Sequence, residues 1–154
     1  MPNTIRREIS RRTLDIIPLI MRVMSAEMRQ SLPGIQPGHI SLLGILRYRA
    51  HTLGDLADRL SVSAPTMSNT ISTLEERGWV GRRRAENDRR LVWIEITDAG
   101  QAALDKVEDN VETRLTDLLS DLNDQDAATL VSGLTVLRDV FATALESDPK
   151  LCNE

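Results

Sequence analysis

The feature that most constrains the fold is a change of hydrophobic period in the middle of the chain. Between residues 51 and 78, apolar side chains recur three or four positions apart, which is typical of helices. Residues 91–97, "LVWIEIT", instead alternate between two faces, which is typical of a strand with one side buried. The preceding "WVGRRR" (79–84) can form the partner strand. The centre of the chain is therefore predicted to be helical and then to form a β-hairpin.

Capping residues divide the helical part into two short helices. Thr52 can cap the first, with Asp55 three residues on as in a capping box. Ser63 can cap the second, Pro65 is tolerated in its first turn, and Gly78 suits its C-terminal end. The short segment "SVS" separates them. The pattern predicts a helix-turn-helix.

The second of these helices has two different faces. Met67, Ile71 and Leu74 form an apolar stripe, and the remaining face is short and polar: Ala64, Thr66, Ser68, Asn69 and Thr73. Short side chains let a helix enter the major groove of DNA, and Ser, Thr and Asn can donate to phosphates or base edges. The same face would also suit the solvated side of a small helical bundle. This helix alone leaves both interpretations open.

Five arginines cluster on the predicted hairpin, although the net charge of the chain is −4. They are Arg82, Arg83, Arg84, Arg89 and Arg90. Residues 1–97 carry 15 Lys or Arg against 10 Asp or Glu, whereas residues 98–154 carry 4 against 13. Arginine suits phosphate neutralisation and insertion into a narrow minor groove. A polyanionic partner is therefore expected for the basic part.

Longer helical patterns flank this centre. An N-terminal helix is expected from Ile5 to about Gln30, kinked or split at Pro18, and "SLPGIQPG" (31–38) ends it. A short, mostly buried helix then precedes the helix-turn-helix. After Thr97, a helix cap, two more helices are expected. Their apolar stripes are Leu104, Val107, Val111, Leu115 and Leu118 in the first, and Leu130, Leu134, Leu137, Phe141 and Leu145 in the second.

At this point the sequence resembles a known family. "LADRLSVSAPTMSNTISTLEERGWVGRRRAENDRRLVWIEITDAGQAAL" is similar to the winged helix-turn-helix core of MarR-type transcriptional regulators, through "LSVSxPTxSxxIxxLEERGxV", "RRxxxxDRR" and "ITDAG". The resemblance implies a mainly α fold with a small β-hairpin wing. It also implies an N-terminal dimerisation helix in residues 1–34, a DNA-binding domain in 35–97 and C-terminal dimerisation helices in 98–154.

The resemblance further implies a cytoplasmic homodimer that binds double-stranded DNA at a pseudo-palindromic operator. Repression relieved by a small-molecule effector is the commoner mode in the family, and activation is the alternative. The matching recognition positions are Ser63, Ala64, Pro65, Thr66, Ser68, Asn69 and Thr70. The matching wing residues are Arg82, Arg83, Arg84, Asp88, Arg89 and Arg90, with Arg90 held by Asp88 and entering the minor groove. Trp93 departs from the pattern, and we expect it to rest on a neighbouring helix rather than on DNA.

A small aromatic or anionic effector is implied between the first two helices and the DNA-binding lobe. The candidate residues are Met21, Met24, Met28, His39, Leu43 and Arg47. Methionines at helical spacing suit a core or a dimer interface equally well, and His39 suits a helix cap. Thiol sensing is disfavoured because the single cysteine, Cys152, lies in the tail. No metal or other cofactor is expected, since His39 and His51 lack neighbouring cysteines.

Other classes of protein fit the sequence less well. A winged helix used for protein contact would present an apolar or acidic recognition face and a wing without basic residues. An enzyme would need a phosphate loop, a nucleophile elbow, a zinc motif or a paired carboxylate site, and no such motif is evident, so we expect no catalytic activity. The sequence also lacks an uninterrupted run of eighteen apolar residues and a signal-peptide pattern, so no membrane span or secretion is expected.

Overall fold

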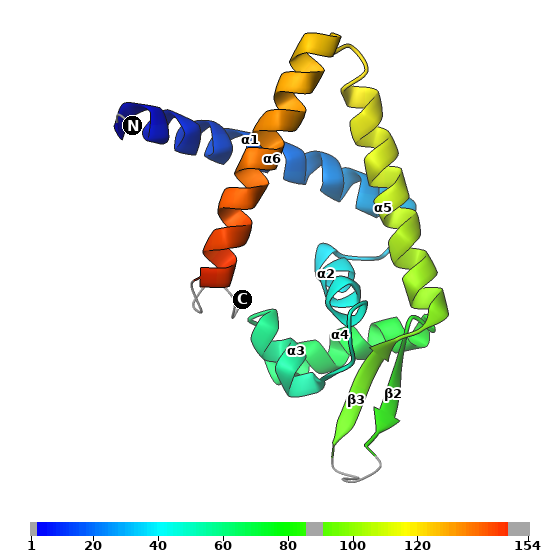
Figure 1. Cartoon of the computed structure of the whole chain (residues 1–154). Helices are drawn as coiled ribbons and strands as arrows, with labels where there is room; N and C mark the ends of the chain where they lie inside the picture. Colours follow the sequence, from blue (N-terminus) through cyan, green and yellow to red (C-terminus); the bar gives the residue numbers. More distant parts are fainter. Residues whose placement is uncertain (1–2, 86–90, 148–154) are drawn as a thin grey trace.

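The computed structural model describes residues 3–85 and 91–147, which form a mainly helical chain with one small sheet (Figure 1). The elements in chain order are α1 (Asn3–Ser31), α2 (Pro37–Leu46), β1 (His51–Thr52), α3 (Leu53–Arg59), α4 (Ala64–Glu76), β2 (Val80–Arg84), β3 (Val92–Ile96), α5 (Asp98–Leu118) and α6 (Asp124–Ser147). The predicted helix-turn-helix is therefore α3 and α4, and the predicted hairpin is β2 and β3. Both predictions, and the mainly α fold class, are confirmed.

The sheet is antiparallel and has the strand order β1-β3-β2. In the hairpin Val80 lies opposite Ile96 and Arg84 lies opposite Val92. The two-residue strand β1, which pairs His51 with Ile94, was not predicted; the sequence pattern assigned this segment to the start of a helix. Helix α3 instead begins at Leu53, with the predicted capping box of Thr52 and Asp55 in place.

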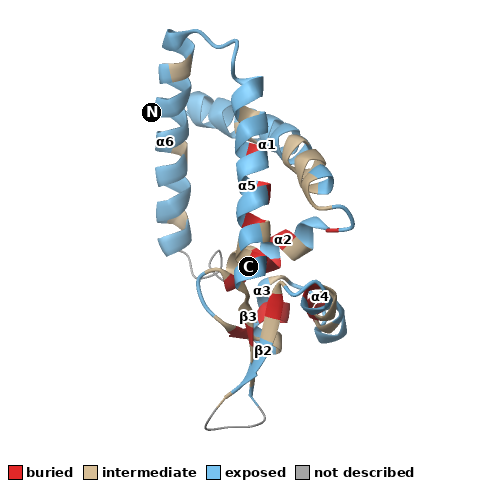
Figure 2. Cartoon of the chain, turned by 90° about the vertical axis from the view of Figure 1, so that its right-hand side faces the viewer, coloured by how far each residue is buried: buried red, intermediate tan, exposed pale blue. Residues whose placement is uncertain are grey.

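The core lies where α2, α3, α4 and α5 meet the sheet, and Figure 2 shows its buried residues gathered there. The fully buried large side chains are Leu42, Leu43, Leu46, Leu56, Met67, Ile71, Leu74, Ile94, Leu104 and Val107. Half of them come from the apolar stripes predicted for α4 and for the first half of α5. Helix α2 is mostly apolar, and its residues Ile40, Leu42, Leu43 and Leu46 are buried in this core.

The beginning of α5 is joined to the segment that follows α4. The Thr97 hydroxyl caps α5 by accepting from the backbone N–H of Gly100 at 3.1 Å, and it donates to the carbonyl oxygen of Gly78. The backbone N–H of Thr97 donates to the carbonyl oxygen of Trp79 at 3.0 Å. A Cβ atom on Gly100 would collide with that same carbonyl group. The "TDAG" sequence (97–100) therefore combines a helix cap at Thr97 with a close backbone approach at Gly100 that requires glycine.

Helix α1 runs unbroken through Pro18, so of the two expected effects, a kink or a split, the split is wrong and the kink stays a prediction. Proline removes one backbone hydrogen bond, which leaves the carbonyl group of Leu14 without its helical donor. The side chain of Leu14 is 69% exposed, and water can reach this part of the helix. The helix therefore tolerates the loss.

Helix α6 and the N-terminal half of α1 expose their apolar stripes. No residue of α6 is buried (Figure 2). Ile9, Ile16 and Phe141 are each about half exposed. A hollow of about 1150 Å³ lies between α1 and α6, and its apolar lining includes Leu19 and Leu137. By length and composition alone, α6 is apolar enough to cross a membrane, with a mean hydropathy of 1.4. Arg138 and Asp139 interrupt the apolar residues of α6, so the sequence has no uninterrupted apolar run here.

Candidate nucleic-acid interface

The N-terminus of α4 is held by its own side chains. The Ser63 hydroxyl accepts from the backbone N–H of Thr66 at 3.3 Å, and the two hydroxyl groups lie 2.8 Å apart. Pro65 occupies the first turn, where its missing N–H costs no helical hydrogen bond. The predicted cap and its proline are both confirmed. This turn is exposed, and its cap is formed by residues of the same turn.

The seven predicted recognition positions all lie at the beginning and along the outer side of α4. Ser63, Ala64, Pro65, Thr66 and Asn69 are exposed, whereas Ser68 and Thr70 are half-buried. On the inner side, Met67, Ile71 and Leu74 are at most 1% exposed. The structure therefore presents the short polar face outward, and a direct role in DNA contact stays a prediction.

The three arginines of β2 differ in their surroundings. Arg82 Nε lies 3.1 Å from Glu75 Oε2, and Arg83 Nε lies 3.3 Å from Glu95 Oε2. Arg84 is exposed and forms no ion pair with another residue of the described ranges. Asp88, Arg89 and Arg90 lie outside the described residues, so the arrangement expected for Arg90 stays a prediction.

The Arg82–Glu75 pair joins the hairpin to the last turn of α4. Glu75 Oε2 accepts a hydrogen bond from Arg82 Nε, which makes the contact a salt bridge. Both members are about 40% exposed, so water screens their attraction. The pair therefore marks a place where the first strand of the hairpin contacts the C-terminal turn of α4.

A second contact at the end of α4 was not predicted. The guanidinium of Arg77 lies 5.2 Å from the ring centroid of Trp79, and its Nη2 donates to the carbonyl oxygen of Pro33 at 3.3 Å. A guanidinium over an aromatic face is attracted by the ring quadrupole. This contact ties the α1–α2 loop to the segment between α4 and β2. Sequence spacing gave no signal of it, because Arg77 and Pro33 are 44 residues apart.

Trp93 is half-buried on β3. In the sheet it lies opposite Arg83 on β2 and Thr52 on β1. Its flanking neighbours are therefore strands, and the expectation that it rests on a helix stays untested.

The candidate effector residues are spread over several environments. Met21 is 53% exposed, Met24 and Met28 pack against the core, and Leu43 is completely buried. The Nδ1 atom of His39 accepts from the backbone N–H of Gln36 at 3.3 Å, so His39 forms a helix cap as the sequence suggested. Burial, followed by the nearby charge of Arg77, lowers the pKa of His39. The hollows between α1 and α5 and between α2 and α3 are lined by other side chains.

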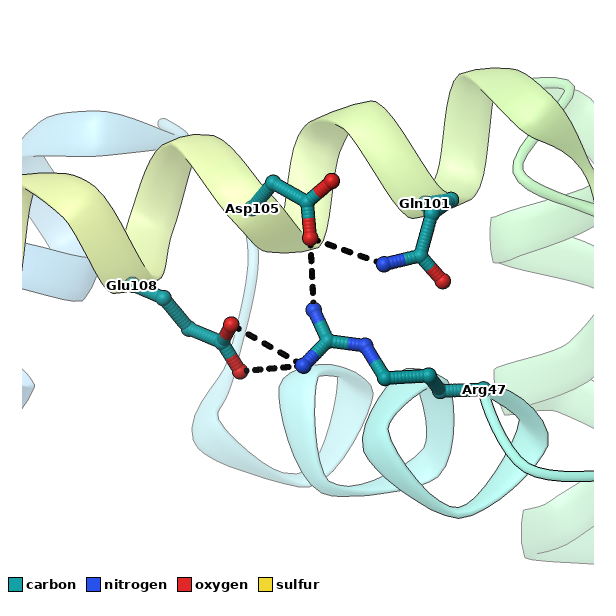
Figure 3. A network of polar contacts seen from close by, with 4 residues as sticks. All are labelled: Arg47, Gln101, Asp105 and Glu108. Carbon is teal, nitrogen blue, oxygen red and sulfur yellow. Dashed lines mark hydrogen bonds and ion pairs between the residues drawn. The ribbon is translucent and has the colours of Figure 1, made fainter.

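Arg47, the remaining candidate, forms a polar network with α5 (Figure 3). Its Nη2 donates to Asp105 Oδ1 at 2.7 Å, and its Nη1 donates to both carboxylate oxygens of Glu108 at 2.9 Å. Gln101 donates to the same oxygen of Asp105 at 2.7 Å. The Arg47 side chain is therefore engaged by two carboxylates that the sequence analysis did not single out.

His51 is a buried polar side chain of the core, at 5% exposure. Burial lowers the pKa of His51, and the charges of Arg59 and Arg49 act in the same direction against a smaller opposing effect of Asp55. These effects favour the neutral form of the imidazole beside the sheet.

Known proteins share both the sequence pattern and the fold. The MarR family profile matches residues 37–92, which include α2 and the helix-turn-helix. YwhA, an uncharacterised HTH-type transcriptional regulator of Bacillus subtilis, is 25% identical over 57% of this chain and 63% of its own length. PecS, an HTH-type transcriptional regulator of Dickeya dadantii, is 32% identical over 55% of this chain and 54% of its own. The chain thus spans a little over half the length of these relatives.

Solved structures extend the likeness to most of the chain. The transcriptional regulator Tm0710 of Thermotoga maritima superposes with a TM-score of 0.76 at 24% identity, over 88% of this chain and 98% of its own. A mutant of MepR from S. aureus, bound to an oligodeoxyribonucleotide, gives a TM-score of 0.67 at 20% identity, over 86% and 97%. The fold is therefore a winged helix with flanking helices. The chain is therefore similar to the MarR family across its helix-turn-helix, residues 37–92, and shares the winged-helix fold over most of its length.

Proposed function

We propose that the protein is a sequence-specific regulator that binds double-stranded DNA through α4 and the β2–β3 hairpin. The observation that carries the proposal is the Arg82–Glu75 contact, which joins the arginine-bearing strand to the last turn of the helix that carries the exposed polar face. A helix with short polar side chains suits the major groove, and adjoining arginines suit phosphates or the minor groove. The likeness to MepR, whose structure contains an oligodeoxyribonucleotide, supports this use of the surface.

The proposal includes a homodimer. Residues 1–34 and 98–154 would form the dimerisation part, and residues 35–97 the DNA-binding domain. The hollow between α1 and α6 is mostly apolar, and large exposed apolar surfaces mark sites of association. A second copy would cover this surface in a symmetric interface. It would also provide a second recognition helix, which fits a pseudo-palindromic operator with half-sites about 34–36 Å apart.

Repression relieved by an effector completes the proposal. The effector would be a small aromatic or anionic molecule, and its candidate residues are those named from the sequence, Met21, Met24, Met28, His39, Leu43 and Arg47. An anion at Arg47 would have to compete with Asp105 and Glu108. Such competition would loosen α2 from α5 and change how the DNA-binding domain is held. A regulator of this kind would act in the cytoplasm, where the DNA lies.

The experiment that tests the proposal begins with selection of duplexes from a random library by the purified full chain. The best duplex is then titrated by fluorescence anisotropy at two salt concentrations, with random DNA as competitor. We expect a selected motif with two related halves and binding that resists the competitor. Binding that is weak, equally strong on random DNA and abolished by moderate salt would show a general polyanion surface instead.

A further inference from the structure

Asn69 occupies the centre of the outward face of α4. Successive residues of a helix are about 100° apart, so the buried stripe of Met67, Ile71 and Leu74 is centred about 170° from Asn69. Thr66 and Thr73 lie about one turn away on either side. Asn69 itself is exposed. If this face meets DNA, the Asn69 side chain points more directly into the groove than its neighbours do.

The threonine hydroxyls on this face are already engaged. Thr70 Oγ1 donates to the carbonyl oxygen of Thr66 at 3.1 Å, and Thr73 Oγ1 donates to the carbonyl oxygen of Asn69 at 3.0 Å. The hydroxyl of Thr66 shares a hydrogen bond with that of Ser63. A hydroxyl that gives its hydrogen to the backbone can still accept a hydrogen bond, but it has no hydrogen left for a base acceptor. The hydroxyls of Thr70 and Thr73 therefore have a restricted capacity to read bases.

The carboxamide of Asn69 has no hydrogen-bond partner among residues 3–85 and 91–147. It therefore offers one acceptor and two donor hydrogens from a single planar group. Ser68 and Ser72 also have unengaged hydroxyls, but both are half-buried on the flank of the face. A single hydroxyl can bind donors and acceptors alike, so it distinguishes bases poorly. The group with the greatest capacity to select a base is Asn69.

We infer that Asn69 selects an adenine in each half-site of the bound DNA. In the major groove adenine presents the N6 amino donor beside the N7 acceptor, which matches Oδ1 and Nδ2 of a carboxamide. Guanine presents two acceptors on the corresponding edge, which would leave Oδ1 without a donor. The inference rests on the proposed function and adds to it the base that is read and the residue that reads it.

The test uses the duplex selected by the wild-type protein. Each adenine of one half-site is replaced in turn by 7-deaza-adenine, which lacks the N7 acceptor, and by purine, which lacks the N6 amino group. At one position we expect each analogue to weaken the affinity of the wild-type protein. Loss of the whole bidentate contact is expected to lower the affinity about 5- to 140-fold, and the effects of the two analogues should approach this value. Asn69→Ala should lose affinity for the unmodified duplex, and the analogues at that position should cause it no further loss.

Two controls separate the base contact from other effects. Thr73→Val removes a hydroxyl whose hydrogen is already given to the backbone, so it should keep the same adenine preference. Circular dichroism should show an intact fold for Asn69→Ala, since the side chain is exposed and alanine favours helices.

The outcomes distinguish this inference from the proposed function. If the wild-type protein selects no motif, the proposed function itself fails. If a motif is selected but Asn69→Ala weakens binding equally on selected and random duplexes, Asn69 contacts the DNA backbone and the inference is overturned. Analogue effects that persist unchanged in Asn69→Ala would overturn it as well, while leaving the regulator intact.

Discussion

Arg47 Nη2 lies 2.7 Å from Asp105 Oδ1, and this contact joins α2 to the helix that leads away from the winged domain (Figure 3). Glu108 binds the second terminal nitrogen, so one guanidinium bridges two carboxylates of α5. The Nε atom of Arg47 is buried and has no hydrogen-bond partner among the described residues. The terminal nitrogens therefore supply the polar contacts that fix α2 against α5 at this point.

Arg47→Met should destabilise the fold, because it leaves Asp105 and Glu108 facing each other without a cation. Both carboxylates are about half exposed, which places the expected loss at about 1–2 kcal/mol. Arg47→Lys keeps the charge but not the planar guanidinium, so its free energy of unfolding should lie between those of the wild type and Arg47→Met. Urea unfolding measures the three free energies. A loss below about 0.5 kcal/mol for Arg47→Met would show that the network contributes little.

Arg84→Gln should weaken DNA binding without changing stability, because Arg84 is exposed and pairs with no acidic residue of the described part of the chain. If it contacts one phosphate, the slope of log affinity against log salt should fall by about 0.9. Arg90→Ala, at the predicted tip, should act in the same direction. Lys106→Gln, on the exposed side of α5, removes an equal charge away from the proposed interface and should keep the wild-type slope. Equal slopes for Arg84→Gln and the wild type would remove Arg84 from the interface.

Gly100→Ala should destabilise the protein, although alanine is the better helix former. The new Cβ would collide with the backbone carbonyl group of Trp79, so the first turn of α5 would have to move. Overpacking of this kind costs about 1–3 kcal/mol. Gly44→Ala in α2 is the matched control, since a Cβ there meets no atom within 4 Å. Thermal unfolding should show a lower Tm for Gly100→Ala alone, and a Tm equal to that of Gly44→Ala would contradict the packing argument.

Leu137→Asp should abolish the proposed dimer, because Leu137 lines the apolar hollow between α1 and α6. Phe141→Asp should do the same, since Phe141 is 51% exposed in the single chain. Thr135→Asp places the same charge on the opposite side of α6 and should leave the dimer intact. Light scattering would report half the wild-type mass for the first two variants. An unchanged mass for both would place the interface elsewhere.

Stability should fall as the pH drops from about 7.5 to 5.5. His39 and His51 both have a pKa lowered in the folded protein below the ordinary value of 6.5. The unfolded chain therefore binds protons first as the pH falls through 6.5, and this binding stabilises the unfolded state relative to the folded state. Urea unfolding at several pH values measures this trend. His39→Gln should reduce it, because an amide oxygen can accept from Gln36 without titrating, and a trend unchanged in that variant would assign it to other groups.

The sequence by itself determined the elements whose signals are local. Ser63, Thr97 and the capping box of Thr52 lie within a few residues of the groups they bind, so their spacing predicted where α3, α4 and α5 begin. The change from helical to alternating period predicted the hairpin, because it reflects which faces of neighbouring residues are buried. The outward polar face of α4 followed from the same periodicity.

Only the tertiary structure decided which distant groups meet. Arg47 and Asp105 are 58 residues apart, so no local sequence pattern links them. Arg47, which the sequence offered as an effector-binding cation, is paired with α5 in the structure. The Arg82–Glu75 and Arg77–Pro33 contacts and the strand β1 likewise depend on how elements pack. Local sequence patterns indicate which side of a helix or strand is buried. Which distant side chains come into contact depends instead on how whole helices and strands are positioned. For that reason the sequence predicted the surface of α4, and the structure was needed to show which of its polar groups remain available.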